Sequence, residues 1–428
     1  APHCVSASSI LLKNKIEFDR PMRGKVLNAH VAAVTAIFAL FTAAALADRS
    51  EDARRAFFAV ENRVSKFQKP DEIFPSRGMR PSGKPVPLPA AAVPEDFRIR
   101  YQWQGNTYDI DDFQDRTQGQ ALLILKDGKI VREIYRNGSK PDTRFISFST
   151  GKSITSTLVG MAIDDGHIAS VDDKLTTYLP ALVGSAYDEV TIRQALQMAS
   201  GVEWNEDSYD HNDMTIPLSY LNEHSMIRQR FRMVEGANAL PRAAAPGSKF
   251  NYNTLETCVL GWLVENATGR RLATYMEERL WQPAGMEFDA SWLLDGPEDI
   301  GREMAGGLLA ASLRDYGRYG LLMMNQGRVG NRQIVSSAWV RQATTVNDAA
   351  VDYGKLYEDY ALGYGYQWWL FPGGNFEAQG VYGQFIYVAP EEDVVIVVLS
   401  TWPEAWVDQF EFETYAFFEA VVNALDGL

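Results

Sequence analysis

The feature that most constrains the fold is the position of the strand-forming segments, which lie near opposite ends of a helix-rich region in this 428-residue chain. Residues 121–125 and 130–135 flank Asp127-Gly128, a dipeptide that supplies the positive φ angles of a tight hairpin turn. Residues 384–389 and 393–400 are apolar and rich in β-branched side chains. Helical patterns cover residues 191–198, 254–267, 272–280, 313–324 and 410–425. We therefore predict an α/β fold, in which helices flank an antiparallel sheet built from both segments, with an additional all-helical domain.

The N-terminal region contains the longest apolar run of the sequence, VAAVTAIFALFTAAALA at residues 31–47. Arg23 and Lys25 precede this run and small residues end it, a pattern typical of a secretory signal peptide that begins at Met22. Residues 1–21 are then upstream sequence. The alternative is an uncleaved membrane anchor. With cleavage after residue 47, we predict an exported bacterial protein, periplasmic or secreted, without stable membrane insertion.

Charge and composition exclude several classes of partner. The chain has 41 Lys and Arg against 55 Asp and Glu, a net charge of -14, and no basic run, which argues against nucleic-acid binding. Cys4 and Cys258 are too few for a disulfide framework or a cysteine zinc site. His167, His211 and His224 lack metal-ligand spacing. We therefore expect no metal and no cofactor, whereas the oligomeric state stays open, a homodimer included.

Proline content divides the chain further. Residues 69–94 hold seven of the 19 prolines, so we interpret them as an extended strap or linker that contributes no core element. We accordingly predict four parts. They are residues 1–47 as upstream sequence and signal peptide, 48–95 as an N-terminal helix and strap, 96–165 with 300–428 as an α/β domain, and 166–299 as a mainly helical domain. The cleft between sheet and helical block is the default site.

One motif has catalytic spacing, the Ser-x-x-Lys of Ser149 and Lys152 at the start of a helix predicted from about residue 149 to Asp165-Gly166. Residues three apart on a helix are neighbours, about 5–6 Å apart at Cβ, so the lysine amine can reach the serine hydroxyl. Burial would lower the pKa of the amine and make it a base. The alternative is an N-cap serine beside a solvated lysine, and the spacing alone leaves both open.

Several further motifs follow in order. They are Phe148-Ser149-Thr150-Gly151-Lys152-Ser153, Asp164-Asp165-Gly166-His167-Ile168, Gln197-Met198-Ala199-Ser200-Gly201-Val202, Pro246-Gly247-Ser248-Lys249-Phe250-Asn251-Tyr252-Asn253 and Ala305-Gly306-Gly307. In this ordered set the chain resembles the penicillin-recognising serine hydrolases of the class C β-lactamase type. Within that group it is most similar to the family VIII carboxylesterases and the 6-aminohexanoate-dimer (nylon-oligomer) hydrolases. The resemblance implies a β-lactamase-like fold, a nucleophilic Ser149 and a neighbouring Lys152. It also implies a Tyr252 whose phenolate the lysine cation would favour.

The third motif of that family, Lys-Thr-Gly or His-x-Gly on an edge strand, corresponds to Ala378-Gln379-Gly380. Gly380 suits a close backbone approach to substrate, and the resemblance implies that the Ser149 and Val381 amides form the oxyanion hole. Two departures matter. Ala378 replaces the cation, which favours neutral esters or amides, and Thr254 stands where the Tyr-x-Asn motif has Asn. The missing polar side chain is expected from Thr254, from Asn253 or from neither.

The expected activity is hydrolysis of carboxylic esters or linear amides through an acyl-enzyme, with a small-molecule ester or amide as substrate. Trp204, Tyr209 and Tyr382 are predicted to contact this substrate, together with Gly380. One alternative is a β-lactamase or D-alanyl-D-alanine peptidase. Another is a non-catalytic binding protein that keeps the fold. The natural substrate, its acyl length and the preference between esters and amides stay open.

Overall fold

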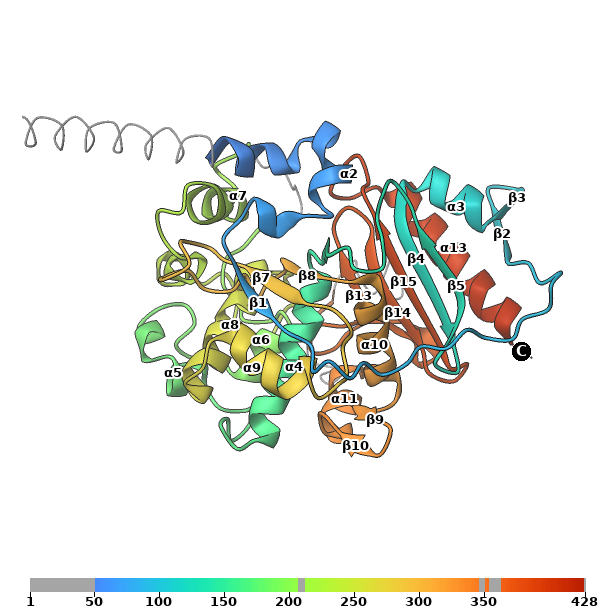
Figure 1. Ribbon diagram of the computed structural model, residues 1–428. Helices are drawn as coiled ribbons and strands as arrows, with labels where there is room; N and C mark the ends of the chain where they lie inside the picture. Colours follow the sequence, from blue (N-terminus) through green and yellow to red (C-terminus); the bar gives the residue numbers. More distant parts are fainter. Residues whose placement is uncertain (1–50, 207–211, 346–350, 354–362, 427–428) are drawn as a thin grey trace, which may run out of the picture. The chain divides into compact units, whose positions relative to one another are not determined.

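A seven-stranded antiparallel sheet is the framework of the computed structural model, which describes residues 51–206, 212–345, 351–353 and 363–426 (Figure 1). Its strand order is β11-β12-β13-β14-β15-β4-β5. The bounds are β4 Gly119–Lys126, β5 Lys129–Tyr135, β11 Gly363–Tyr364, β12 Trp369–Leu370, β13 Phe376–Gly380, β14 Gln384–Ala389 and β15 Val394–Ser400. Because β15 pairs with β4, strands from both segments of the chain form one sheet, as predicted.

The β4–β5 hairpin forms where the sequence predicts it. Asp127 and Gly128 have φ angles of 51° and 71°, the left-handed values that a two-residue turn of this kind requires.

The two faces of the sheet carry separate apolar clusters, because side chains alternate along each strand. Leu122 and Ile396 belong to the cluster that includes α13 (Asp408–Leu425), and Leu123 and Val395 to the cluster that includes α10 (Leu313–Met324). Figure 1 shows these two helices against opposite faces of the sheet. The sheet is therefore covered on both sides, which explains why its central strands are buried along their whole length.

The middle of the chain is helical, as predicted, with α4 packed against α8. Asn253 caps α8 by accepting hydrogen bonds from two backbone N–H groups, and Gly269 ends it with a φ of 69°. The bounds are α2 Arg63–Lys66, α3 Ile110–Arg116, α4 Thr150–Asp164, α5 Leu175–Tyr178, α6 Ile192–Leu196, α7 Pro217–Asn222, α8 Thr254–Thr268, α9 Leu272–Met276 and α11 Ser337–Ala343. The helix expected over 272–280 divides into α9 and a π-helical turn, Glu277–Trp281.

The proline-rich strap corrects one expectation. It contains β1 (Ser76–Met79), the edge of a four-stranded sheet completed by β7 (Ala290–Leu293), β8 (Leu309–Ala311) and β6 (Phe145–Ile146). Phe74 and Met79 of the strap are 3% and 1% exposed. The prediction that the strap contributes no core element is therefore wrong. The pairing partner lies about two hundred residues away, and the Arg-Gly within β1 hides the apolar alternation of a strand.

Two short hairpins complete the secondary structure, β2 (Arg100–Trp103) with β3 (Asn106–Asp109) and β9 (Arg328–Val329) with β10 (Arg332–Gln333). Residues 53–428 group as one unit by their contacts, and the finer division into an α/β and a helical domain stays a prediction. Within the described ranges, no helix is both long and apolar enough to cross a bilayer. The predicted signal peptide at residues 31–47 lies outside the described residues.

Candidate active site

The start of α4 brings the Ser-x-x-Lys pair together. Ser149 is the N-cap residue, and the Nζ of Lys152 lies 2.8 Å from its Oγ. The Lys152 amine also donates a hydrogen bond to the backbone oxygen of Gly306. α4 is buried on every side over its first thirteen residues, and Lys152 is only 1% exposed. The solvated lysine of the alternative interpretation is therefore absent, and the serine hydroxyl has one amine at hydrogen-bond distance.

Burial controls the protonation of this amine. It lowers the pKa of Lys152 to about 8, while the negative charge of Glu206 acts in the opposite direction. A neutral fraction therefore exists near neutral pH. A neutral Lys152 that donates one N–H to Gly306 can still accept the proton of the Ser149 hydroxyl, which is the requirement for a general base.

Tyr252 joins this pair from the segment that precedes α8. The Lys152 Nζ lies 5.0 Å from the centre of the Tyr252 ring, and Trp369 stacks on the ring at 5.7 Å. Burial raises the pKa of Tyr252 above its usual value and the charge of Glu206 adds to this, whereas a hydrogen bond with Ser149 lowers it. The phenol form is therefore favoured. This differs from the expected phenolate, because desolvation outweighs any help from the lysine cation.

Glu206 is a member of the site that the sequence did not reveal. Its carboxylate accepts a hydrogen bond from the backbone N–H of Thr254, at 3.1 Å, where α8 begins. Burial raises the pKa of Glu206, while Lys152 and the contacts with Thr254 lower it. A lone glutamate in a polar loop carries no sequence signal of this proximity. The site thus holds one carboxyl group that acts electrostatically on both Lys152 and Tyr252.

The predicted oxyanion donors meet at a contact between a strand end and a helix start. A Cβ atom on Gly380 would lie 2.9 Å from the backbone nitrogen of Ser149 and 2.8 Å from the oxygen of Ser147. Only glycine permits this approach, which is between two backbones of the protein. The backbone N–H groups of Ser149 and Val381 take no part in the loop and cap hydrogen bonds of the described residues. Both residues line the same cavities, an arrangement that an oxyanion hole requires, and their role as its donors stays a prediction.

The backbone around Ser149 is held in uncommon conformations. Phe148, Leu308 and Tyr382, none of them glycine, have φ angles of 43°, 95° and 64°. Residues in such regions cost about 1–3 kcal/mol each and persist where packing enforces them, often at functional sites. All three contribute to the cavities at Ser149.

The other predicted residues are placed as follows. Thr254 lines a cavity at Ser149, whereas Asn253 is buried as the cap of α8. Trp204 is buried and lines neither cavity at Ser149. Tyr382 lines one cavity, with the guanidinium of Arg63 4.3 Å from its ring centre. Tyr209 lies outside the described residues.

Trp369, one of the aromatic residues before the last strands that the sequence offers as cleft residues, lines the second cavity. Arg63 is a further residue at the cavities, and neither its type nor its spacing predicts this position. Within the part of the chain that the structure describes, no group of three or more His, Cys, Asp or Glu side chains is placed to hold a metal ion.

Comparison with known proteins identifies the family of the chain. The family model for Beta-lactamase matches residues 104–416. The 6-aminohexanoate-dimer hydrolase of Paenarthrobacter ureafaciens is 31% identical over 307 residues, which cover 69% of this chain and 76% of that protein.

Two solved structures have a similar fold. A Bacillus anthracis protein that carries a provisional 6-aminohexanoate-dimer hydrolase name superposes with a TM-score of 0.78 at 23% identity, over 87% of this chain and 96% of its own. EstCE1, named a hydrolase with promiscuous acyltransferase activity, superposes with a TM-score of 0.55 at 18% identity, over 73% and 94%. From the family match and the similarity to the Paenarthrobacter enzyme, the chain belongs to the β-lactamase and penicillin-binding family of serine hydrolases.

Proposed function

We propose that the protein hydrolyses carboxylic esters or linear amides through an acyl-enzyme formed at Ser149. The observation that carries this proposal is the 2.8 Å contact between the Ser149 hydroxyl and a buried lysine amine whose pKa is lowered to about 8. Such a pair supplies a nucleophile and its base without further groups.

The steps follow from the positions of the groups. Neutral Lys152 takes the hydroxyl proton as Ser149 Oγ attacks the substrate carbonyl carbon, and the oxygen anion is bound by the Ser149 and Val381 N–H groups. When the bond to the leaving group breaks, its alkoxide or amine receives a proton from Lys152, with the Tyr252 phenol as relay. Water then attacks the acyl-enzyme carbonyl and gives a proton to Lys152, which passes it to the departing Ser149 Oγ, so that the acid is released and the serine hydroxyl and neutral Lys152 are restored.

A neutral acyl substrate suits the site better than a β-lactam or a D-alanyl-D-alanine peptide. Ala378 is fully buried in β13 and offers no cation to a substrate carboxylate. The similar Paenarthrobacter protein is named for a linear amide dimer, and EstCE1 is named a hydrolase that also transfers acyl groups. These names support linear amides and esters as the first substrates to test.

A fluorophosphonate probe with intact-mass detection tests the acyl-enzyme directly. We expect one adduct on the parent, none on Ser149→Ala, and strongly slowed labelling of Lys152→Ala and Tyr252→Phe. Ser156→Ala is the matched control, because Ser156 is a fully buried serine two turns further along α4 and should leave labelling intact. Absence of any adduct on the parent would favour the non-catalytic binding protein.

Substrate class is tested by kcat/KM for nitrophenyl esters, linear amide oligomers and a cephalosporin. We expect the esters or amides to be preferred. Turnover confined to the cephalosporin would replace this proposal with a β-lactamase. Export is a separate proposal, tested by N-terminal sequencing of protein recovered from a bacterial periplasm or medium, where a start after residue 47 is expected and an intact residue 31–47 segment would contradict it.

A further inference from the structure

Ser149 lies where two cavities meet. The first has a volume of about 360 Å³ and the second of about 630 Å³. Ser149, Val381 and Arg63 line both, so a substrate bound at the oxyanion donors extends into each cavity from the same carbonyl group.

The chemistry assigns the two halves of the substrate to the two cavities. The group that protonates the leaving atom must lie beside it. Tyr252 lines the second cavity and not the first, together with Glu206 and Trp369. The leaving group therefore belongs in the second cavity. The first cavity, on the side of Thr254, then receives the acyl chain.

The wall of the first cavity comes partly from the N-terminal part of the described chain. Phe58, Ala59 and Arg63 line it: Phe58 ends the 3-10 turn Ala56–Phe58, Ala59 lies between that turn and the next, Val60–Asn62, and Arg63 is the first residue of α2. Arg63 fixes this segment by donating hydrogen bonds to the backbone oxygens of Phe58 and of two residues after β15, Trp402 and Pro403. A core anchor, Phe57, is fully buried. The segment is therefore a built wall rather than a loose covering.

The charged groups in this cavity are engaged with one another or with the backbone. Arg55 makes two hydrogen bonds to the carboxylate of Glu223, at 2.6 and 2.9 Å, and Arg228 contacts the same carboxylate. The rest of the lining is mainly apolar, with Phe58, Leu218, Met226, Ile227, Met304 and Leu308. A charged end on the acyl chain would lose its hydration here without gaining a partner that is not already bound.

We propose that the segment Ala56–Arg63 is the selectivity wall of an acyl-binding cavity, and that this cavity takes an apolar, uncharged acyl chain. The inference rests on the proposed function and specifies its substrate class, an ester or amide of an aliphatic acid.

Filling the cavity tests the wall. Ala59 lies between the two 3-10 turns with extended backbone angles that any residue adopts, so Ala59→Phe places a ring in the cavity with little backbone strain. We expect the ratio of kcat/KM for nitrophenyl octanoate over nitrophenyl acetate to fall by at least about tenfold. Val60→Phe is the matched control, since Val60 is 57% exposed and lines neither cavity. An equal ratio in Ala59→Phe, Val60→Phe and parent would overturn the proposal.

A substitution that enlarges the cavity tests the role of the wall in the opposite direction. It also keeps the proposal testable if Ala59→Phe fails to fold. Phe58→Ala should raise the ratio of kcat/KM for nitrophenyl dodecanoate over octanoate. Thermal melting identifies any variant that fails to fold. The kcat/KM of Phe58→Ala and of the parent is also compared for a series of alcohol leaving groups on one acyl chain. If the variant changes the preference among leaving groups instead of the preference among acyl chains, the assignment of the two cavities is reversed and the proposal is overturned.

The charge requirement is tested on the parent protein. Nitrophenyl octanoate should be cleaved at least about tenfold faster than the corresponding esters with a terminal carboxylate or a terminal ammonium group. Faster cleavage of either charged ester would overturn the apolar assignment. Fluorophosphonate labelling distinguishes a failure of this inference from a failure of the proposed function. A protein that is labelled at Ser149 but shows no wall effect refutes only this inference, whereas an unlabelled protein refutes the proposed function itself.

Discussion

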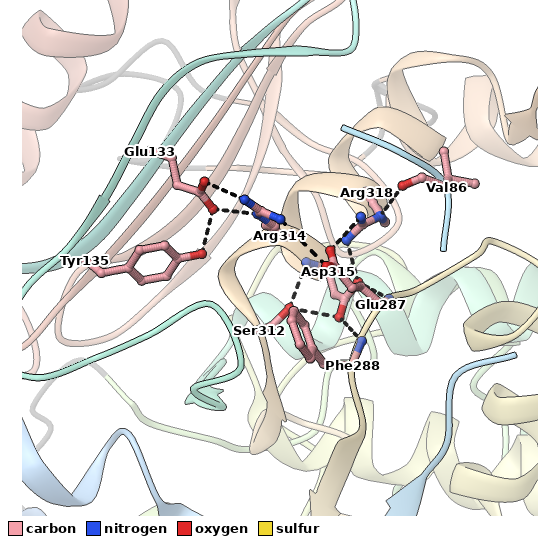
Figure 2. Close-up of polar contacts among 9 residues, drawn as sticks. All are labelled: Val86, Glu133, Tyr135, Glu287, Phe288, Ser312, Arg314, Asp315 and Arg318. Atoms are coloured by element: carbon pink, nitrogen blue, oxygen red, sulfur yellow. Dashed lines mark hydrogen bonds and ion pairs between the residues drawn. The ribbon is translucent and has the colours of Figure 1, made fainter. Parts of the chain in front are cut away.

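Two helix starts in this protein bury charged side chains and treat them in opposite ways. At α10, the Asp315 carboxylate accepts hydrogen bonds from the backbone N–H groups of Glu287 and Phe288, at 2.7 and 3.0 Å, and from Arg318 at 3.0 Å (Figure 2). At α4, among the described residues, the Lys152 amine has only two neutral oxygens as hydrogen-bond partners. The start of α10 places a cation and several donors at hydrogen-bond distance from its carboxylate, whereas the opposite charge that acts on Lys152, that of Glu206, does so without a direct hydrogen bond between described atoms.

At Asp315 itself burial outweighs these donors and raises the pKa, whereas the effect of partners prevails at the neighbouring ion pair of Arg314 and Glu133. Beside α10, burial acts to raise the pKa of Glu133, but hydrogen bonds from Arg314 and Tyr135 lower it overall, so the ion pair keeps its charge (Figure 2). At α4, burial lowers the pKa of Lys152. An opposite charge at hydrogen-bond distance therefore keeps the half-buried Glu133 ionised, whereas the buried Lys152, which has neutral hydrogen-bond partners among the described residues, favours the neutral amine more than an exposed lysine does.

The largest expected effect is on activity, from substitution of Lys152 at the start of α4. Lys152→Arg should reduce kcat/KM for a nitrophenyl ester by about 10²–10⁴-fold, because a guanidinium stays protonated and cannot act as the base. Lys152→Ala should lose a similar amount. Steady-state kinetics with melting curves for each variant provide the measurement. An active Lys152→Arg would show that the neutral amine is not needed and would remove the contrast between the two helix starts.

At the start of α10 we expect substitution of Asp315 to reduce stability without reducing catalytic activity. Asp315→Ala should lower the free energy of unfolding by about 3–5 kcal/mol, because Arg318 and two backbone N–H groups lose their buried acceptor. Urea unfolding measures this, and the activity per folded molecule should stay near that of the parent. Asp289→Ala, a nearby exposed acid, is the control. Equal stability of the two variants would contradict the structural role of the α10 cluster.

The pH dependence sharpens the comparison. The activity should rise as Lys152 loses its proton, with an acid limb in kcat/KM near pH 8. The charge of Glu206 raises the pKa of Lys152, so Glu206→Gln should move this limb to lower pH. Exposed Glu203→Gln should leave it in place. A limb that moves to higher pH in Glu206→Gln would refute the assignment of the limb to Lys152.

The smallest expected effect concerns a third helix start, that of α13. Burial raises the pKa of Glu411 to about 7, and its hydrogen-bond partners, Gln379 and Tyr415, are uncharged. A carboxyl whose folded pKa exceeds its unfolded value, near 4.5, costs stability as pH rises from about 4.5 through 7. Glu411→Gln should therefore lose less stability between pH 5 and 8 than the parent, as measured by thermal melting. An identical pH dependence in both proteins would contradict this account.

The sequence predicted those features of the structure that depend on residues close together in the chain. Asp127-Gly128 requires its hairpin turn, and Gly269 ends α8 because it accepts a left-handed φ. The pairing of Ser149 with Lys152 is likewise a matter of three residues along one helix. The meeting of strands from both segments followed from the order of strands and helices along the chain.

What could not be predicted depends on contacts across long sequence distances. Glu206 reaches Lys152 only because its loop meets the start of α8, and no residue type near it signals this. Arg63 lies at the cavities because it binds carbonyls more than three hundred residues later. The phenol state of Tyr252 depends on desolvation, which spacing does not report.

Because Gly380 has no side chain, the catalytic rate depends on how tightly β13 packs against the start of α4. β13 and α4 are in direct contact there, so the distance between the two amides that we propose as oxyanion donors depends on how closely the sheet packs against the helix. Warming or a remote cavity-forming substitution that lets these layers drift apart would disable turnover while the secondary structure is still intact. In such a protein, loss of activity reports early loosening of the interior, before the cooperative transition begins.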